Sequence, residues 1–457
     1  MLRHHTLIVS NNIKIVFWCS NPNLIMKKYL VIILVLIITS CKSSSNPPSI
    51  EIIAEDYVKL VLEIGQYDNA FVDAYFGPEE WKPTEPKSET LPLDNFVQRA
   101  NTLISQCDEL LVSDNPNLEI ARINMLKKQL IAVRTKTEMI GGKTFPFDEE
   151  AKLLYDAVPP HFSVIHFNKL LVGLDSLLAG EGDLPKRYNN FMAEFIIPKE
   201  KLDTVFRVAI DESRRITKHY FELPENENFV LEYVTDKVWG GYNYYQGNAQ
   251  SLIQINTDFP IYISRAIDLG SHEGYPGHHI YMMLTEQNLV NTKGWMEYSV
   301  YPLFSPFSLI SEGSANYGID VVFPGDKRID FEKEYLFPLA RIDTSKAEIF
   351  YAVQDVMSKL NYARNETARA YLNGDLSREN AIKQIEKYSL FTPEKAEQSV
   401  RFIEANRSYV INYNLGKDLV AKHVDMLGGS YNNPEKRWDI FKELLSNPYS
   451  ASTLKKE

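Results

Sequence analysis

Cysteine is scarce in this chain, with three residues among 457: Cys19, Cys41 and Cys107. No two of them have the close spacing of a metal-binding pair, and their positions form no disulfide framework. Cys107 falls on the apolar side of a predicted helix, where a thiol acts as a small packing group. The sequence therefore excludes a disulfide-stapled fold and a cysteine-based metal site.

Positive charge and long apolar runs are also lacking. The 49 Lys and Arg residues are outnumbered by 60 Asp and Glu residues, which gives a net charge of −11. A nucleic-acid partner is not expected, because phosphate binding needs clustered positive charge. Beyond residue 41 no apolar stretch approaches the roughly 20 residues of a membrane-spanning helix. We also find no sequence repeat and no low-complexity segment in the body of the chain.

The N-terminal region carries a targeting pattern. Residues 26–28 read MKK, and an apolar run over 30–38 leads to small residues before Cys41. A basic start, a short apolar core and small residues before the cleavage point are typical of a secretory signal peptide, here over 26–40. The ending at Cys41 resembles a bacterial lipobox, which implies that this cysteine becomes the lipidated first residue.

This interpretation sets the expected location. A lipid on Cys41 would anchor the protein to a membrane of the bacterial cell envelope, on the periplasmic or the cell-surface face. Residues 41–48, rich in Ser, Asn and Pro, are expected to form a tether. Residues 1–25 are expected to be an upstream mis-start or an extension. The alternative is a transmembrane anchor followed by an incidental cysteine.

Beyond the tether the hydrophobic pattern is mainly helical. Apolar residues recur three and four positions apart, as on the buried face of an amphipathic helix. We expect one mainly α domain over 49–457 with a few short strands, and the alternative is a helical N-terminal half packed over a catalytic half. The predicted helices cover 49–65, 94–111, 118–136, 331–361, 377–388 and 393–413. The predicted strands cover 229–235 and 251–256.

The segment from His272 to His279 reads HEGYPGHH and holds three of the nine histidines of the chain. A hydrolytic zinc ion needs about three protein ligands and an open position for water, with a carboxylate beside that water to take its proton. A helix brings histidines four apart onto one face. Here the next histidines stand six and seven positions after His272, so an unbroken helix does not explain a shared site.

Pro276 and Gly277 offer a way to close this spacing. In a straight helix a residue seven positions on lies ~10 Å away, too far to share a metal ion with bonds of ~2 Å. Proline cannot continue the helix, because it lacks an N–H group and its ring clashes with the carbonyl of His272. We therefore predict a helix interruption between Glu273 and His278, which lets His272 and one histidine of the pair converge on one metal ion.

Glu312 is the candidate third ligand. It interrupts an apolar stretch, where a buried carboxylate is costly unless it is paired or bound to a metal. Small residues around it permit a close helix approach: Gly313, Ser314, Ala315 and Gly318. Asn316, one turn later, is expected to steady the carboxylate, and Asp268, one turn before His272, to orient that imidazole.

A metal-free reading of these residues stays open. The three histidines can form a hydrogen-bonded polar cluster, and Glu312 can be a solvent-facing helix residue. Among the other six histidines, His161 and His166 lie near each other in the sequence, at a spacing that shares no helix face. We expect packing or surface roles for those two.

The two motifs resemble the bacterial domain-of-unknown-function 885 family of predicted metallopeptidases. Its hallmark is H-E-x-x-P-G-H-H followed by E-G-x-A-x-Y, which here reads HEGYPGHH over 272–279 and EGSANY over 312–317. Upstream, VDAYFGPE over 72–79 and DKVWGGYN over 236–243 also resemble the family, so the likeness extends over most of the mature chain. Ser314 and Ile319 depart from it, because many relatives have Trp and Glu at these positions.

The resemblance implies a helical fold related to the gluzincin-type zinc peptidases, which use two histidines and a glutamate. Carried over residue by residue, it makes His272, His278 and Glu312 the ligands of one zinc ion and Glu273 the general base. It favours His278 over His279, since the Gly-His ending of related zinc motifs aligns there. A peptide or another amide is the substrate that the resemblance implies.

The expected function is therefore a zinc-dependent hydrolase, and a peptidase first. His279 is the candidate second catalytic group, because a spare histidine can donate a hydrogen bond to the developing oxyanion. Tyr298 and Tyr301 are alternatives for that role. Arg341 is a candidate for binding a substrate carboxylate.

Two rival functions stay open. A surface lipoprotein that captures glycans or peptides without altering them fits the lipid anchor and an aromatic group: Trp239, Tyr242, Tyr244 and Tyr245. A metal hydrolase that acts on a non-peptide amide or ester is the other. Stoichiometric zinc would separate the binding protein from both hydrolases.

Overall fold

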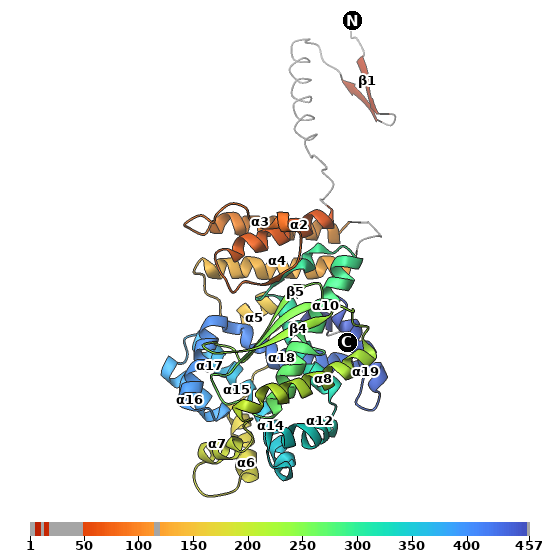
Figure 1. The fold of residues 1–457 in the computed structure, drawn as a ribbon. Helices are drawn as coiled ribbons and strands as arrows, with labels where there is room; N and C mark the ends of the chain where they lie inside the picture. The colour runs from red at the N-terminus through yellow and green to blue at the C-terminus, as the bar shows by residue number, and fades with distance from the viewer. Residues whose placement is uncertain (1–4, 11–12, 18–48, 114–118, 455–457) are drawn as a thin grey trace. The chain divides into compact units, whose positions relative to one another are not determined.

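The computed structural model describes four stretches of the chain, residues 5–10, 13–17, 49–113 and 119–454 (Figure 1). The predicted signal peptide over 26–40, the lipidation site Cys41 and the tether over 41–48 lie outside these stretches. No helix within them is both long and apolar enough to cross a membrane.

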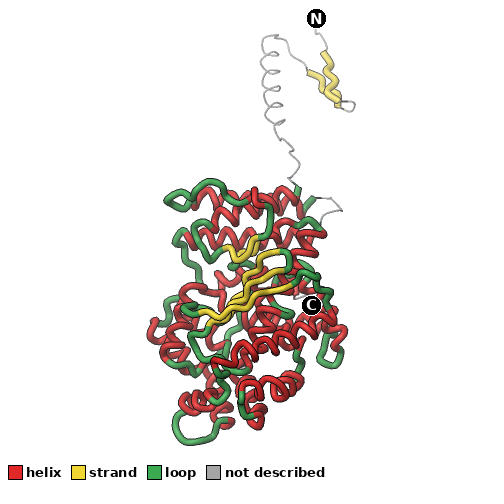
Figure 2. Tube along the Cα trace, viewed as in Figure 1, coloured by secondary structure: helices red, strands yellow, loops and turns green. Residues whose placement is uncertain are grey.

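The chain divides into two compact units, Met1–Pro48 and Ser49–Glu457. In the first unit the described residues form a hairpin, in which β1 (His5–Ser10) pairs antiparallel with β2 (Ile13–Phe17). The second unit is mainly helical, as predicted, and its strands gather in one band among the helices (Figure 2).

Three N-terminal helices of the second unit lie side by side: α2 (Ile50–Gly65), α3 (Leu93–Leu111) and α4 (Ile120–Ile140) (Figure 1). Apolar side chains at three- and four-residue spacing give α2 one continuous buried face. That face consists of Ile53, Tyr57, Leu60, Val61 and Ile64. Cys107 on α3 is fully buried, which confirms its packing role. The predicted helices in these three places are confirmed.

Short strands form two small sheets in the second unit. β3 (Val72–Tyr75) pairs antiparallel with β7 (Val300–Pro302). β4 (Asn228–Val234), β6 (Gln250–Asn256) and β5 (Gly241–Gly247) form a three-stranded sheet in that order. β4 runs parallel to β6, and β5 runs antiparallel to it, so β5 is an edge strand. The strands predicted over 229–235 and 251–256 are confirmed as β4 and β6.

A pair of helices passes through the centre of the unit with their backbones in contact. These are α11 (Pro306–Val322), almost wholly buried, and α18 (Ile411–Met426). A Cβ atom added to Gly313 would lie 2.4 Å from the carbonyl carbon of Gly416, far inside contact distance. The small residues predicted around Glu312 therefore do permit a close helix approach at this point.

The other helices surround these elements (Figure 1). They are α5 (Phe147–Tyr155), α6 (Val164–Leu177), α7 (Leu184–Ala193), α8 (Leu202–Tyr220), α9 (Ser264–Leu269), α10 (His278–Leu284), α12 (Asp326–Phe331), α13 (Phe337–Ala340), α14 (Ala347–Leu360), α15 (Tyr362–Leu372), α16 (Arg378–Ser389), α17 (Pro393–Asn406), α19 (Pro434–Leu445) and α20 (Ala451–Leu454). Short 3-10 turns are η1 (Glu79–Trp81), η2 (Lys199–Lys201), η5 (Met296–Ser299), η7 (Thr344–Lys346) and η8 (Arg407–Val410). Short π-helical segments are η3 (Gly270–Gly274), η4 (Thr285–Thr292) and η6 (Glu332–Leu336).

Two long predicted helices are broken in the structure. The helix expected over 331–361 stops at Arg341, whose φ of 59° is left-handed, and resumes as α14. The helix expected over 393–413 stops after Asn406, because Arg407 also has a positive φ of 52°. Pro338 lies three residues before the first break and was a warning in the sequence, whereas no glycine or proline marks the second break.

Candidate functional site

The helix that carries His272 is interrupted, as predicted. α9 runs into the π turn η3, Tyr275 is extended, and α10 begins at His278. Gly277 allows the chain to fold back, because a Cβ atom there would lie only 1.8 Å from the carbonyl oxygen of His272. Its N–H donates to the carbonyl oxygen of Ser271 at 3.0 Å. The turn therefore brings the start of α10 back over His272.

Three side chains converge at this turn. The Nε2 atoms of His272 and His278 are 3.1 Å apart. Oε2 of Glu312, from α11, lies 3.2 Å from Nε2 of His272 and 3.8 Å from Nε2 of His278. One nitrogen or oxygen atom from each residue thus lies within 4.8 Å of the others, although the histidines come from two helices and the glutamate from a third. The structure brings together the three predicted ligands.

The hydrogen bonds around these residues fit a bound cation. Nδ1 of His278 bonds to Oγ of Ser311 at 3.0 Å, and a ring that donates there keeps the lone pair of Nε2 towards Glu312. Tyr409 donates to Oε1 of Glu312 at 2.7 Å, but the buried Oε2 has no hydrogen-bond partner among the described residues. Two imidazole nitrogens and one carboxylate oxygen are a common donor set for zinc.

Burial and mutual charge decide the protonation of the two imidazoles. Burial, together with the neighbouring His272, lowers the pKa of His278 to about 4, so that ring is neutral at pH 7. Burial also acts to lower the pKa of His272, but the carboxylates of Glu273 and Glu312 raise it above its usual value. Neutral imidazole is the form that binds a metal ion.

Glu273 lies beside the cluster and against the edge strand β5. A Cβ atom on Gly241 would come within 2.8 Å of its Oε1, so glycine makes room for this carboxylate. Asn243, also on β5, donates to the backbone oxygen of Glu273 at 2.6 Å. Burial raises the pKa of Glu273 to about 7, with a further increase from Glu312 that the charge of His272 opposes. A carboxylate with a raised pKa suits the uptake and return of a proton.

His279 does not face this cluster, which corrects the oxyanion role expected for it. The ring is fully buried, with Nδ1 2.8 Å from Oγ of Ser251 and Nε2 3.0 Å from Oε1 of Glu227. Tyr275 and Arg214 also donate to Glu227. Because both ring nitrogens are already bound, His279 has no free N–H for a substrate.

The two expected supporting residues have other partners. Asn316 donates to the backbone oxygens of Glu312 and Tyr413 at 3.0 and 3.3 Å rather than to the carboxylate. Asp268 pairs with Arg328 at 2.8 Å rather than with His272. The hydroxyl of Tyr409 binds the Glu312 carboxylate instead. Sequence reasoning missed it because Tyr409 lies 97 positions further along the chain.

The other candidates are placed as follows. Tyr301 is buried, and burial, followed by the charges of Asp73 and Glu312, raises its pKa. Tyr298 is also buried, and the acid that acts on its pKa is Glu297. Arg341 is exposed at the end of α13.

Asp73 on β3 is a further acid that sequence reasoning did not single out. Its carboxylate accepts a hydrogen bond from Tyr242. Burial, with the charges of Glu312 and Glu273, raises its pKa to about 8. The only signal in the sequence was the motif over 72–79, which resembles the family but gives no role for the aspartate.

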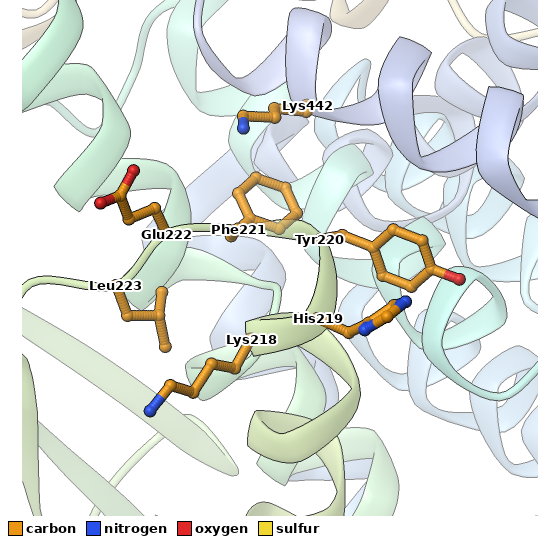
Figure 3. Close-up of a pocket in the computed structure, with 7 residues that line it drawn as sticks. All are labelled: Lys218, His219, Tyr220, Phe221, Glu222, Leu223 and Lys442. Atoms are coloured by element: carbon orange, nitrogen blue, oxygen red, sulfur yellow. The ribbon is translucent and has the colours of Figure 1, made fainter.

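A shallow hollow lies elsewhere, at the C-terminal end of α8 (Figure 3). Its lining residues are Lys218, His219, Tyr220, Phe221, Glu222, Leu223 and Lys442. None of them belongs to the cluster around Glu312, which is the group of possible metal ligands found among the described residues. We therefore place the candidate site at the turn between α9 and α10.

Comparisons with known proteins add little here. The sequence matches no family model, and no curated protein matches it. A solved structure of a candidate lipoprotein from Colwellia psychrerythraea is similar, with 14% identity and a TM-score of 0.49. The similar region covers 82% of this chain and 70% of that one. Nothing about the function of this chain follows from a likeness of that strength.

Proposed function

We propose that this chain is a zinc-dependent hydrolase that acts on peptides, with one zinc ion held by His272, His278 and Glu312. The observation that carries the proposal is the convergence of these three side chains around a buried Glu312 oxygen that has no hydrogen-bond partner among the described residues. A buried carboxylate oxygen without a partner is costly, and a divalent cation removes that cost. The resemblance of the two motifs to a family of predicted metallopeptidases supports the same assignment.

The residues around the cluster supply the rest of the chemistry. A zinc ion held by His272, His278 and Glu312 would supply Lewis acidity towards a water molecule and a substrate carbonyl. Glu273 takes the proton of the attacking water and returns it to the leaving amine, which its raised pKa of about 7 favours. Tyr409 holds Glu312 in place through Oε1. With His279 bound elsewhere, Tyr298 and Tyr301 are the remaining candidates for a hydrogen bond to the oxyanion.

The location of the protein is part of the proposal. The signal peptide over 26–40 and the lipobox ending at Cys41 support attachment of the second unit to a cell-envelope membrane through a lipid. Mass spectrometry of the protein purified from membranes would show a diacylglycerol-modified Cys41 as the first residue. A Cys41→Ser variant that stays in the membrane fraction would contradict lipid anchoring.

The rival reading, a lipoprotein that only binds glycans, is favoured by one observation. Partly exposed rings of Trp239, Tyr242 and Tyr244 form a row, with centroids 5.5 and 4.6 Å apart. Tyr245, expected to belong to this group, is buried instead. Partly exposed rings can stack on a sugar, but they can equally line a substrate groove.

The decisive experiment measures bound metal. Elemental analysis of purified wild-type protein should give one zinc ion per chain, and His272→Ala and Glu312→Ala should each lose it. His161→Ala is the matched control, because that histidine side chain is 68% exposed and lies outside the cluster. A metal content that is unchanged in both cluster variants would refute the site, and peptide cleavage by the zinc-loaded protein would exclude the binding-only reading.

A further inference from the structure

The turn that joins α9 to α10 sets the distance between two of the candidate ligands. His272 and His278 stand six positions apart in the sequence, and their Nε2 atoms lie 3.1 Å from each other. Within the turn, the N–H group of Gly277 donates to the backbone oxygen of Ser271 at 3.0 Å. A metal site needs its ligands held to within about 0.5 Å, and the contacts around the ligands provide that precision. Side chains that hold this turn therefore bear on metal binding.

Glu227, the residue before β4, contacts this turn at two points through a single oxygen atom. Its Oε1 accepts a hydrogen bond from the hydroxyl of Tyr275, which lies inside the turn. The same oxygen lies 3.0 Å from Nε2 of His279, the residue that follows His278. Because an ionised carboxylate can only accept, Nε2 carries a proton, and Nδ1 accepts from Oγ of Ser251 at 2.8 Å. Oε1 thus links the middle of the turn to the start of α10.

The second oxygen of Glu227 has a separate partner. Oε2 accepts from Nη2 and Nε of Arg214, on α8, at 2.6 and 3.2 Å. The side chains of Glu227 and His279 have no exposed surface, whereas that of Arg214 is 39% exposed. Hydrogen bonds between buried groups are stronger than those that water can replace. Oε1 therefore holds the turn, and Oε2 holds the carboxylate against α8.

We propose that Glu227 is a positioning residue, which holds the turn closed and so keeps His272 and His278 at the separation that a shared zinc ion requires. Two hydrogen bonds to one atom fix Tyr275 and His279 relative to each other. His278 is covalently joined to His279, so it cannot move away from His272 unless one of these bonds breaks. This proposal rests on the zinc site of the proposed function.

The test measures zinc affinity, by competition between the purified full-length protein and a chelator of known zinc affinity. Glu227→Ala removes both bonds to the turn and should raise the zinc Kd by about tenfold to hundredfold, as for other residues that hold metal ligands without touching the metal. One zinc ion per chain should still bind at saturating zinc, because the three ligands remain. Tyr275→Phe removes one of the two bonds and should raise the zinc Kd by about threefold to tenfold.

Two further variants separate the position of Oε1 from other effects. In Glu227→Gln the amide oxygen can still accept from Tyr275 and His279, so the zinc Kd should stay within about threefold of the wild-type value. Tyr245→Phe is the matched control for Tyr275→Phe, because Tyr245 is also buried and donates to a carboxylate, that of Glu286, outside the turn. It should keep the wild-type Kd, even where its Tm falls as far as that of Tyr275→Phe.

Cobalt provides a readout of ligand geometry that a loss of stability alone would not change. The visible absorption of bound Co²⁺ depends on how its ligands are arranged. The spectrum should change in Glu227→Ala and stay as in the wild type in Glu227→Gln and Tyr245→Phe. A wild-type zinc Kd and a wild-type cobalt spectrum in Glu227→Ala would overturn the proposal. If Glu227→Ala does not fold, the same result in Tyr275→Phe would overturn it.

Hydrogen exchange in the metal-free protein separates this proposal from the zinc assignment. The amides of Gly277 and Tyr281 donate to backbone oxygens at 3.0 and 2.9 Å, in the turn and at the start of α10. Loss of the contacts to Glu227 should speed their exchange by about tenfold, while amides of α18 keep the wild-type rate. If the wild type binds no zinc, the zinc assignment fails, and exchange still decides whether Glu227 holds the turn. Unchanged exchange at both amides would overturn that role.

Discussion

His278 and His279 are adjacent in the chain, yet they belong to two clusters of opposite character. Around His279 every polar group has a partner within the protein: Ser251 and Glu227 bind the ring, and Arg214 and Tyr275 bind Glu227. Around His278 two imidazole nitrogens and a carboxylate oxygen face one another, and the oxygen has no hydrogen-bond partner among the described residues.

This contrast teaches how to recognise a ligand site among buried polar residues. Both clusters contain histidine and glutamate, so residue type alone does not separate them. A complete set of hydrogen bonds is typical of a structural network, whereas a buried acceptor without a donor, surrounded by further possible metal ligands, fits a cation site. The cluster around His279 is complete without a ligand, and in the proposed function zinc completes the cluster of His272, His278 and Glu312.

The largest effect on kcat should come from a substitution of Glu273, which belongs to neither of the two clusters. Glu273→Gln should keep one zinc ion and lose about a hundredfold to ten-thousandfold in kcat, because the general base is removed. Glu227→Gln, in the complete cluster, is the matched control and should change kcat by less than tenfold. If Glu273→Gln kept the wild-type kcat, Glu273 would not be the general base of the reaction.

Removal of zinc should destabilise the protein through one cluster only. At a free zinc concentration about a thousand times the dissociation constant, binding contributes ~4 kcal/mol to the free energy of unfolding. Thermal unfolding with and without a chelator should therefore show a lower Tm for the metal-free wild type. Glu312→Ala should show the same Tm under both conditions, and a zinc-dependent shift in that variant would contradict the ligand assignment.

The two adjacent histidines should separate metal binding from stability. In the presence of a chelator, His279→Ala should lose about 1–3 kcal/mol in the free energy of unfolding, because Ser251 and Glu227 lose a buried partner. Its zinc content should stay at one ion per chain. His278→Ala should show the reverse, with zinc lost. Zinc lost from the His279 variant alone would exchange the roles of the two residues.

The smallest expected effect is the pH dependence of stability that Glu227 contributes in the cluster around His279. Burial acts to raise the pKa of Glu227, but hydrogen bonds from His279, Tyr275 and Arg214 outweigh it and hold the pKa at about 2. Because the pKa of Glu227 is lowered, its ionised carboxylate stabilises the fold at pH values above its ordinary pKa of 4.5. This contribution is lost as the pH falls towards about 2. Urea unfolding should show wild type and Glu227→Gln converging in stability across that window, and a constant gap would contradict it.

The sequence predicted those parts of the molecule that depend on local pattern. The helix break follows from Pro276 and Gly277 alone, because neither fits an ordinary helix interior there. Glu312 could be singled out because a charge among apolar and small residues is costly to bury unless a partner or a cation offsets it. The two motifs, which are separate in the sequence, come together in the fold as expected.

What the sequence could not predict depends on residues far apart in the chain. Tyr409 reaches Glu312 across 97 positions, and Glu227 reaches His279 across 52. The expected partners Asp268 and Asn316 were one helical turn from their targets, but longer-range donors and acceptors were better placed. The break at Arg407 was equally invisible, since tertiary contacts can impose a left-handed residue of any type.

The contact between Gly313 and Gly416 has a consequence for anyone who grafts this site onto another scaffold. Copying His272, His278 and Glu312 would not suffice, because the depth at which the glutamate sits is fixed by two helix backbones that touch. Gly416→Ala would push the two helices apart and withdraw the carboxylate from the imidazoles. A faithful transplant would therefore have to include two residues that carry no side chain at all.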